Sequence, residues 1–135
     1  MAIGWRSAAA LIVAPVLLAA SSAERPLRAN EKAAITHSIE AKLVDPASAQ
    51  FRLGPTRPGS EYYCGLVNAK NRMGGYNGFE PFLVRYNPDR TIKIATLPSA
   101  ASIGPSGRFD ATIHQRLWLP LVSATCAKEG YSTAY

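Results

Sequence analysis

The apolar positions of the first predicted element recur every four residues. Ile35, Ile39 and Leu43 therefore lie on one face of a helix, which we expect to run from about residue 31 to residue 44. Asn30 precedes this segment and is a favourable cap for its first turn. Pro46 ends the helix and opens a further short turn, because a proline disfavours the helical conformation of the residue before it.

Alternating apolar and polar residues predict short strands through the middle of the chain. We expect these strands near residues 51–53, 61–70, 82–86 and 91–94. A tight turn joins the last two, because Pro88 presets the backbone angle that such a turn requires. The alternation in the second strand places one set of side chains on the face that the last helix is expected to cover: Cys64, Leu66, Asn68 and Lys70.

Residues 98–108 are small and polar, and we expect an exposed loop there. Asp110 then caps a closing helix. The apolar spacing predicts that this helix buries Ile113, Leu117, Leu121 and Ala124, with Trp118 and Val122 beside them. Pro120 removes one hydrogen bond of the helix, so the helix either kinks or gives way to a second helix at that point.

The order of these elements predicts an α+β fold. An N-terminal helix is followed by an antiparallel meander of about four strands, and a C-terminal helix packs on the sheet. One disulfide is expected to join the closing helix to the second strand. Cys64 and Cys126 are the only cysteines, and they pair if the protein is exported into an oxidising compartment. The alternative is a free catalytic thiol at Cys64.

The first residues predict export. An apolar run from residue 8 to residue 20 follows a start with one arginine and precedes Ser21, Ser22 and Ala23, as is typical of a secretory signal peptide. We expect residues 1–23 to be removed, and residues 24–135 to form a single periplasmic or secreted domain without a transmembrane anchor. The alternative is a membrane anchor, although the run is shorter than the roughly 20 apolar residues of a spanning helix.

The chain is moderately basic. Its formal net charge is +6, and it becomes +5 when Arg6 is removed with the signal peptide. The charges are spread without a basic cluster, so nucleic acid is not an expected partner. The excess favours an anionic ligand, an acidic cell-wall polymer, lipid headgroups or an acidic envelope protein.

The connection from Asn68 to Phe79, called here the 68–79 loop, is rich in glycine and asparagine. In one interpretation the glycines shape a long connection, the asparagines bond to its amides, and nothing binds. In the other, amides near Lys70 and Arg72 hold a carboxylate or phosphate, with Tyr76 as an aromatic wall. The candidate binding residues are Asn68, Lys70, Asn71, Arg72, Gly74, Gly75, Tyr76 and Gly78.

Other patterns for chemistry are weaker. Asp110 and His114 are one helical turn apart, but a metal site needs further ligands, and we predict neither a metal nor a cofactor. Ser106 lacks the strand and helix context of a nucleophile, and no catalytic residue is assigned.

Two segments resemble a widespread family of small exported bacterial proteins of uncharacterised function. They are LVDPASAQF at residues 43–51 and CGLVNAKNRMGGYNGFEPF at residues 64–82. The first departs from the family pattern at Val44, where a lysine is usual. The resemblance implies a shared fold and export, and it brings no catalytic residue.

We therefore expect a non-enzymatic exported binding module that uses the 68–79 loop. One alternative is a small hydrolase or transferase with an anion site at Lys70, Arg72 and Tyr76, and with His114 as a further candidate. Another is a purely structural envelope protein.

Overall fold

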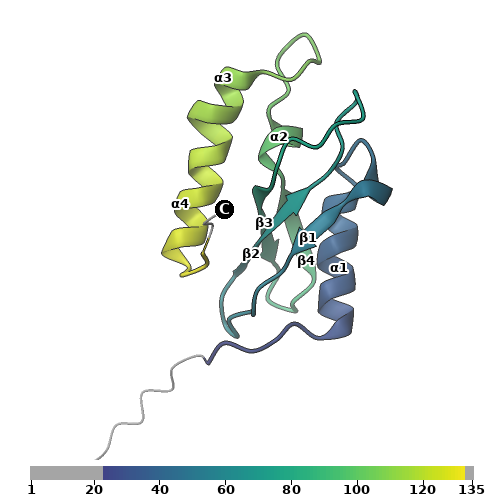
Figure 1. Cartoon of the computed structure of the whole chain (residues 1–135). Coiled ribbons are helices and arrows are strands. Elements are labelled where there is room, and N and C mark those ends of the chain that lie inside the picture. The colour runs from purple at the N-terminus through teal and green to yellow at the C-terminus, as the bar shows by residue number, and fades with distance from the viewer. Residues whose placement is uncertain (1–22, 133–135) are drawn as a thin grey trace, which may run out of the picture.

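A computed structural model describes residues 23–132 of the 135-residue chain. The expected signal peptide, apart from Ala23, lies outside the described residues. The fold is α+β, as predicted (Figure 1). Its elements are α1 (Ala29–Glu40), η1 (Pro46–Ser48), β1 (Gln50–Arg52), β2 (Tyr62–Asn68), β3 (Glu80–Tyr86), β4 (Ile92–Thr96), α2 (Pro98–Ala101), α3 (Ala111–Ile113), η2 (His114–Trp118) and α4 (Leu119–Lys128).

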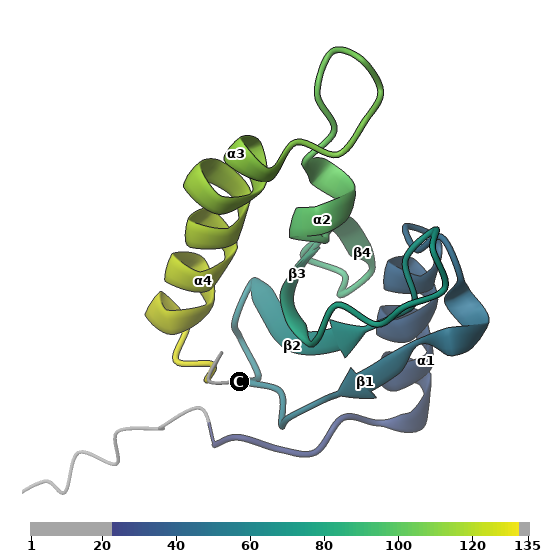
Figure 2. The same cartoon turned by 45° about the horizontal axis from the view of Figure 1, so that its top comes forward.

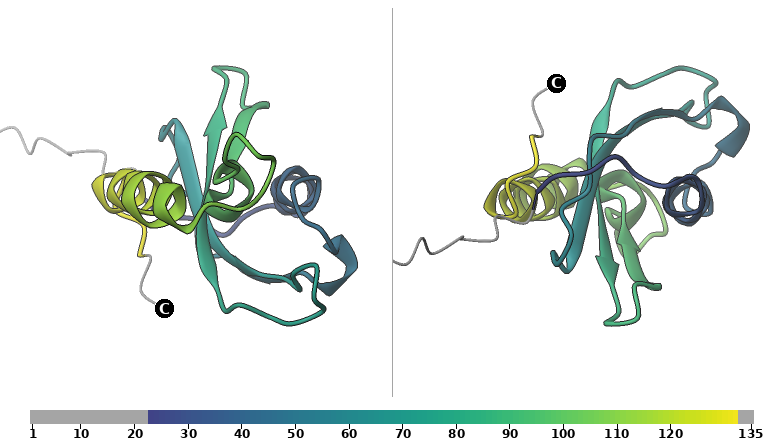
Figure 3. Two further views of the ribbon diagram at one scale, coloured as in Figure 1. Left: turned by 90° about the horizontal axis from the view of Figure 1, so that it is seen from above. Right: turned by 90° about the horizontal axis from the view of Figure 1, so that it is seen from below.

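The strands form the predicted antiparallel meander, in the order β1-β2-β3-β4. Figure 3 shows α1 on one side of this sheet and the helix that contains α4 on the other. Both faces of β2 are accordingly buried, with Tyr63 and Val67 on one and Cys64 and Leu66 on the other. Within residues 23–132, no helix is long and apolar enough to cross a membrane.

The first helix differs from the prediction at both ends. It begins at Ala29 and ends at Glu40, so Asn30 lies inside it rather than at its cap, and Leu43 lies beyond its end. The Glu31 carboxylate accepts a hydrogen bond of 2.9 Å from the Arg28 backbone N–H and pairs with the Arg25 guanidinium at 2.6 Å. These contacts, that with Arg25 foremost, lower the pKa of Glu31 to about 2. An acidic residue in the first turn thus replaces the expected asparagine cap.

The segment after β4 is not simply an exposed loop. Pro98–Ala101 forms the short helix α2, whose first residue is buried, and Ser102 is fully buried behind it. Only the following turn, closed by a bridge between Ile103 and Phe109, is exposed. Small residues are common both in buried turns and in solvated loops. The composition of residues 98–108 therefore does not show which of these structures they form.

The closing helix starts as predicted and then widens. The Asp110 carboxylate caps it by accepting hydrogen bonds from the N–H groups of Thr112 and Ile113. The segment η2 is a π-helix, in which the Leu119 N–H bonds to the carbonyl of His114. This wider turn directly precedes Pro120, which lacks an N–H and would crowd the carbonyl four residues earlier in an α-helix. The expected interruption is therefore a π turn within a continuous helical segment.

The predicted buried face of the closing helix is wrong for Leu117, Leu121 and Ala124 and right for Val122. Val122 and Cys126 are buried against the sheet, whereas Leu117 is 54% exposed and Leu121 is 50% exposed. Ala124 is exposed as well, and Ile113 is only partly buried. The disulfide bonds Cys126 to the sheet, and Val122 lies on the same face of the helix as Cys126. That face therefore packs against the sheet, and Leu117 and Leu121 point toward solvent.

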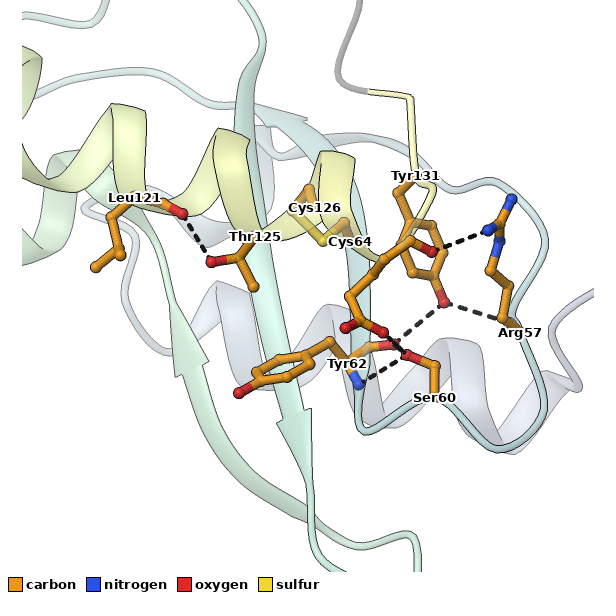
Figure 4. The surroundings of a disulfide bond; sticks show 9 residues. Arg57, Ser60, Tyr62, Cys64, Leu121, Thr125, Cys126 and Tyr131 are labelled. Carbon is orange, nitrogen blue, oxygen red and sulfur yellow. Dashed lines mark hydrogen bonds between the residues drawn. A yellow bond between two sulfur atoms is a disulfide. The ribbon is translucent and has the colours of Figure 1, made fainter.

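The predicted disulfide joins Cys64 of β2 to Cys126 of α4, across 62 residues of sequence (Figure 4). The alternative of a free catalytic thiol at Cys64 is therefore wrong. Just after α4, the Tyr131 hydroxyl donates a hydrogen bond of 3.2 Å to the Tyr62 carbonyl and accepts one of 3.3 Å from the Arg57 N–H. The C-terminal end of the helix is thus fixed to the sheet by both covalent and polar contacts.

Candidate functional site

The 68–79 loop joins β2 to β3 and projects beyond the sheet. Figures 2 and 3 place it on the far side of the sheet from α4. The Lys70 side chain is exposed. The prediction that the closing helix covers Asn68 and Lys70 is therefore wrong, because α4 packs on β2 near Cys64 and the strand carries the loop away from it.

Asn71 organises the loop from within. Its side-chain oxygen accepts hydrogen bonds from the backbone N–H groups of Met73, at 2.9 Å, and Gly75, at 3.2 Å. Its side-chain amide donates a bond of 2.9 Å to the side-chain oxygen of Asn77. Its own N–H bonds to the Gly75 carbonyl at 2.9 Å. One side chain thus fixes the backbone of the whole tip.

The remaining turn geometry depends on glycine. Gly74 and Gly78 have φ angles of 79° and 95°, which favour glycine over any residue with a Cβ atom. The Gly78 N–H donates to the Asn68 side-chain oxygen at 3.2 Å, and the Gly74 N–H donates to the Asn71 carbonyl at 2.9 Å. These contacts confirm the prediction that Asn68 and Asn71 bond to amides of the loop.

These bonds occupy backbone amides that an anion site in the loop would need. The N–H groups of Met73, Gly74, Gly75 and Gly78 all donate to asparagine oxygens inside the loop. A bound carboxylate or phosphate would have to displace those acceptors. Recognition of an anion at this loop would therefore fall to the exposed cationic side chains, and not to a cradle of these amides.

Ser48 of η1 anchors the loop to the rest of the fold, which the sequence did not reveal. Its hydroxyl oxygen accepts a hydrogen bond of 2.9 Å from the Lys70 N–H, and its carbonyl accepts one of 3.1 Å from the Tyr76 hydroxyl. Lys70 and Tyr76 also form an isolated bridge, with the ammonium 5.7 Å from the ring centre. At the far end of the loop, the Arg52 guanidinium lies 3.8 Å over the Phe79 ring.

The loop presents its outward side chains to solvent. Met73 is 95% exposed and Tyr76 is 45% exposed. Lys70 and Arg72, which both precede Met73 in sequence, are exposed as well. Met73 was not among the predicted binding residues, although a large apolar side chain at the centre of a polar loop was a signal that could have identified it.

The structure brings Lys70 and Tyr76 together but places His114, the further candidate of the proposed enzyme site, on another element. His114 lies on η2, with its Nδ1 atom 3.4 Å from the Ser102 hydroxyl and its ring 5.4 Å from that of Phe109. A cleft of about 540 Å³ is lined by residues that include Arg52 and Tyr131, and another of about 530 Å³ lies between α1 and the β3–β4 hairpin. Neither of these clefts is lined by Lys70, Tyr76 or His114.

A carboxyl group directly follows the loop. Glu80 begins β3 and accepts hydrogen bonds from both the N–H and the hydroxyl of Ser99 at the start of α2. Burial raises the pKa of Glu80. The hydrogen bonds from Ser99 and the charge of the nearby His114 lower this pKa, but by less than burial raises it. Sequence reasoning missed this contact because the two residues lie on different elements.

Comparison with known proteins found no matching family model, curated protein or solved structure. The family resemblance of residues 43–51 and 64–82 therefore stays a prediction, and a proposal about function has to rest on the geometry of the chain itself.

Proposed function

We propose that this protein is an exported, non-enzymatic binding module that contacts its partner through the 68–79 loop. One observation carries the proposal: Met73 is 95% exposed at the tip of a loop whose backbone is fixed by its own asparagines. Met73 and the 45% exposed Tyr76 place two large side chains on a backbone that is already ordered, so a partner can contact both without first ordering the loop.

The rigidity of the loop favours recognition. Ordering a flexible loop on binding consumes part of the interaction free energy, and a loop that is already ordered avoids this cost. Methionine adapts its shape to an apolar pocket. Lys70 and Arg72 add positive charge next to it. The matching partner surface is an apolar pocket with an acidic rim, such as that of an envelope protein.

Export is part of the same proposal. The apolar run at residues 8–20 supports passage through a secretory pathway. The disulfide between Cys64 and Cys126 supports a final location in an oxidising compartment, the periplasm or the exterior.

The alternatives have less support. Catalysis needs reacting groups that converge in a shielded pocket, and Lys70 and Tyr76 stand instead on an exposed loop away from His114. A purely structural protein would tolerate any change of Met73 that leaves stability intact. Site-specific cross-linking from position 73 in the exporting cell separates these possibilities: the binding module forms one discrete adduct, and the other two classes form none.

A further inference from the structure

The outer face of the closing helix is apolar and exposed. Leu117 is 54% exposed and Leu121 is 50% exposed. Figures 1 and 3 show the helix as one outer edge of the molecule, with the sheet on its inner side only. The exposed apolar residues of this surface, called here the outer helix face, are Leu117, Pro120, Leu121, Ala124 and Ala127.

The exposed charged side chains of residues 111–128 are both basic, although the flanking Asp110 and Glu129 balance their formal charge. Arg116 and Lys128 are exposed near the two ends of the outer helix face. The only carboxylates between residues 110 and 129 are Asp110 and Glu129. Asp110 caps the helix, and Glu129 accepts a hydrogen bond of 2.6 Å from the Ser60 hydroxyl. The described ion pairs lie elsewhere in the molecule: Arg25–Glu31, Arg57–Glu24 and Arg85–Glu61.

The outer helix face is small for self-association, since a stable protein interface takes roughly 20–30 residues from each side. A helix with leucines on one face and basic residues at its borders instead suits the headgroup region of an anionic bilayer.

We propose that the outer helix face docks the protein on an anionic membrane surface. The leucines enter the boundary between headgroups and acyl chains, while Arg116 and Lys128 meet lipid phosphates. The disulfide and Tyr131 hold the helix against the sheet, so the face is presented without unfolding. This inference goes beyond the proposed function: the 68–79 loop lies on the far side of the sheet and stays free for its own partner (Figure 2).

The experiment is vesicle flotation of residues 24–135, the expected mature chain, with equal parts of phosphatidylglycerol and phosphatidylcholine, and with phosphatidylcholine alone. The apolar variant is Leu117→Gln with Leu121→Gln, and the charge variant is Arg116→Glu with Lys128→Glu. Ile94→Gln is the matched control, because Ile94 on β4 is 50% exposed, like Leu121. Residues 1–23 are left out because their apolar run would bind vesicles in every variant.

We expect the wild type and Ile94→Gln to float with the anionic vesicles. Both helix variants should bind at least about fivefold more weakly, and added salt should weaken the wild type. The charge variant changes only exposed side chains, so it keeps the test valid if the apolar variant folds poorly.

Equal flotation of the wild type and the charge variant would overturn the proposal. So would a wild-type dimer that the apolar variant cannot form, since the face would then bind a second copy. Leucine-dependent binding of soluble polyglutamate as tight as that of vesicles would point instead to an acidic protein.

Discussion

The Tyr76 hydroxyl donates a hydrogen bond of 3.1 Å to the backbone carbonyl of Ser48. These residues belong to two separate segments, 43–51 and 64–82, for which the sequence predicts a family resemblance. The pairing of β1 with β2 joins the same segments, with Gln50 opposite Asn68. The segments are therefore parts of one structural unit, in which η1 supports the 68–79 loop.

Asn71→Ala should destabilise the protein by about 1–2 kcal/mol, because it removes the acceptor for two backbone N–H groups and the donor to Asn77. For a domain of this size, thermal unfolding should move down by about 5–10 °C. Met73→Ala is the matched control in the same loop, and its exposed side chain predicts a change within about 0.5 kcal/mol. Equal midpoints for the two variants would show that Asn71 does not hold the loop.

Gly65→Ala should cost about 1–3 kcal/mol of unfolding free energy through overpacking. Gly65 pairs with Phe82 across β2 and β3, and a Cβ atom there would lie 2.6 Å and 2.8 Å from carbons of the Phe82 ring. At Gly54 an added Cβ atom would have no heavy atom within 4 Å, so Gly54→Ala should be neutral. Urea unfolding of both variants measures the difference, and a neutral Gly65→Ala would contradict this packing.

The disulfide should contribute about 4 kcal/mol in the chain-entropy model, because it closes a loop across 62 residues. The double variant Cys64→Ser with Cys126→Ser should therefore unfold at a much lower denaturant concentration. Wild-type protein in a strong reductant should approach the variant, while the variant itself should not respond to the reductant. A reductant-insensitive wild type would indicate that the bond adds little to stability.

Glu80 should make stability depend on pH, because burial raises its pKa in the folded state. Below its unfolded pKa of about 4.3 the group is protonated in both states, and its contribution is fully present. This contribution is lost as the pH rises through the higher folded value, because folding then keeps a charged group out of water. Glu80→Gln should remove this loss of stability. The unfolding midpoint of the wild type should therefore drop relative to that of the variant as the pH rises from mildly acidic to neutral. Parallel pH profiles would refute the assignment.

Regular patterns made much of the fold predictable. Period-two alternation located β2, β3 and β4, and Pro88 marked the hairpin turn between the last two. The spacing of Ile35 and Ile39 gave the buried face of α1, and both side chains are fully buried. Asp110 marked the true start of the closing helix. Each of these signals is local, so a single sequence is enough to detect it.

The sequence-based predictions were wrong where long-range contacts override a local pattern. The leucines at 117 and 121 have core-like spacing, but the bond at Cys126 and the π turn before Pro120 set which side of the helix faces the sheet. The contacts of Ser48 with the loop join distant parts of the chain. No periodicity reveals a hydrogen bond between residues that far apart in sequence.

The candidate site was predictable in kind but not in detail. Asparagines at 68 and 71 were expected to bond to loop amides, and the loop backbone confirms such bonds. The same bonds occupy amides that an anion site would need. The exposure of Met73 follows from the whole loop geometry, which composition does not specify.

The central claim is that the tip of the 68–79 loop contacts a partner, and cross-linking from position 73 tests it most directly. Benzoylphenylalanine replaces Met73 in one exported protein and Ile94, 50% exposed on β4, in another. Irradiation of intact cells should give one discrete adduct from position 73 and none from position 94. Lys70→Ala with Arg72→Ala should abolish that adduct without lowering the unfolding midpoint. The absence of any adduct from position 73, or the same adducts from both positions, would contradict the account.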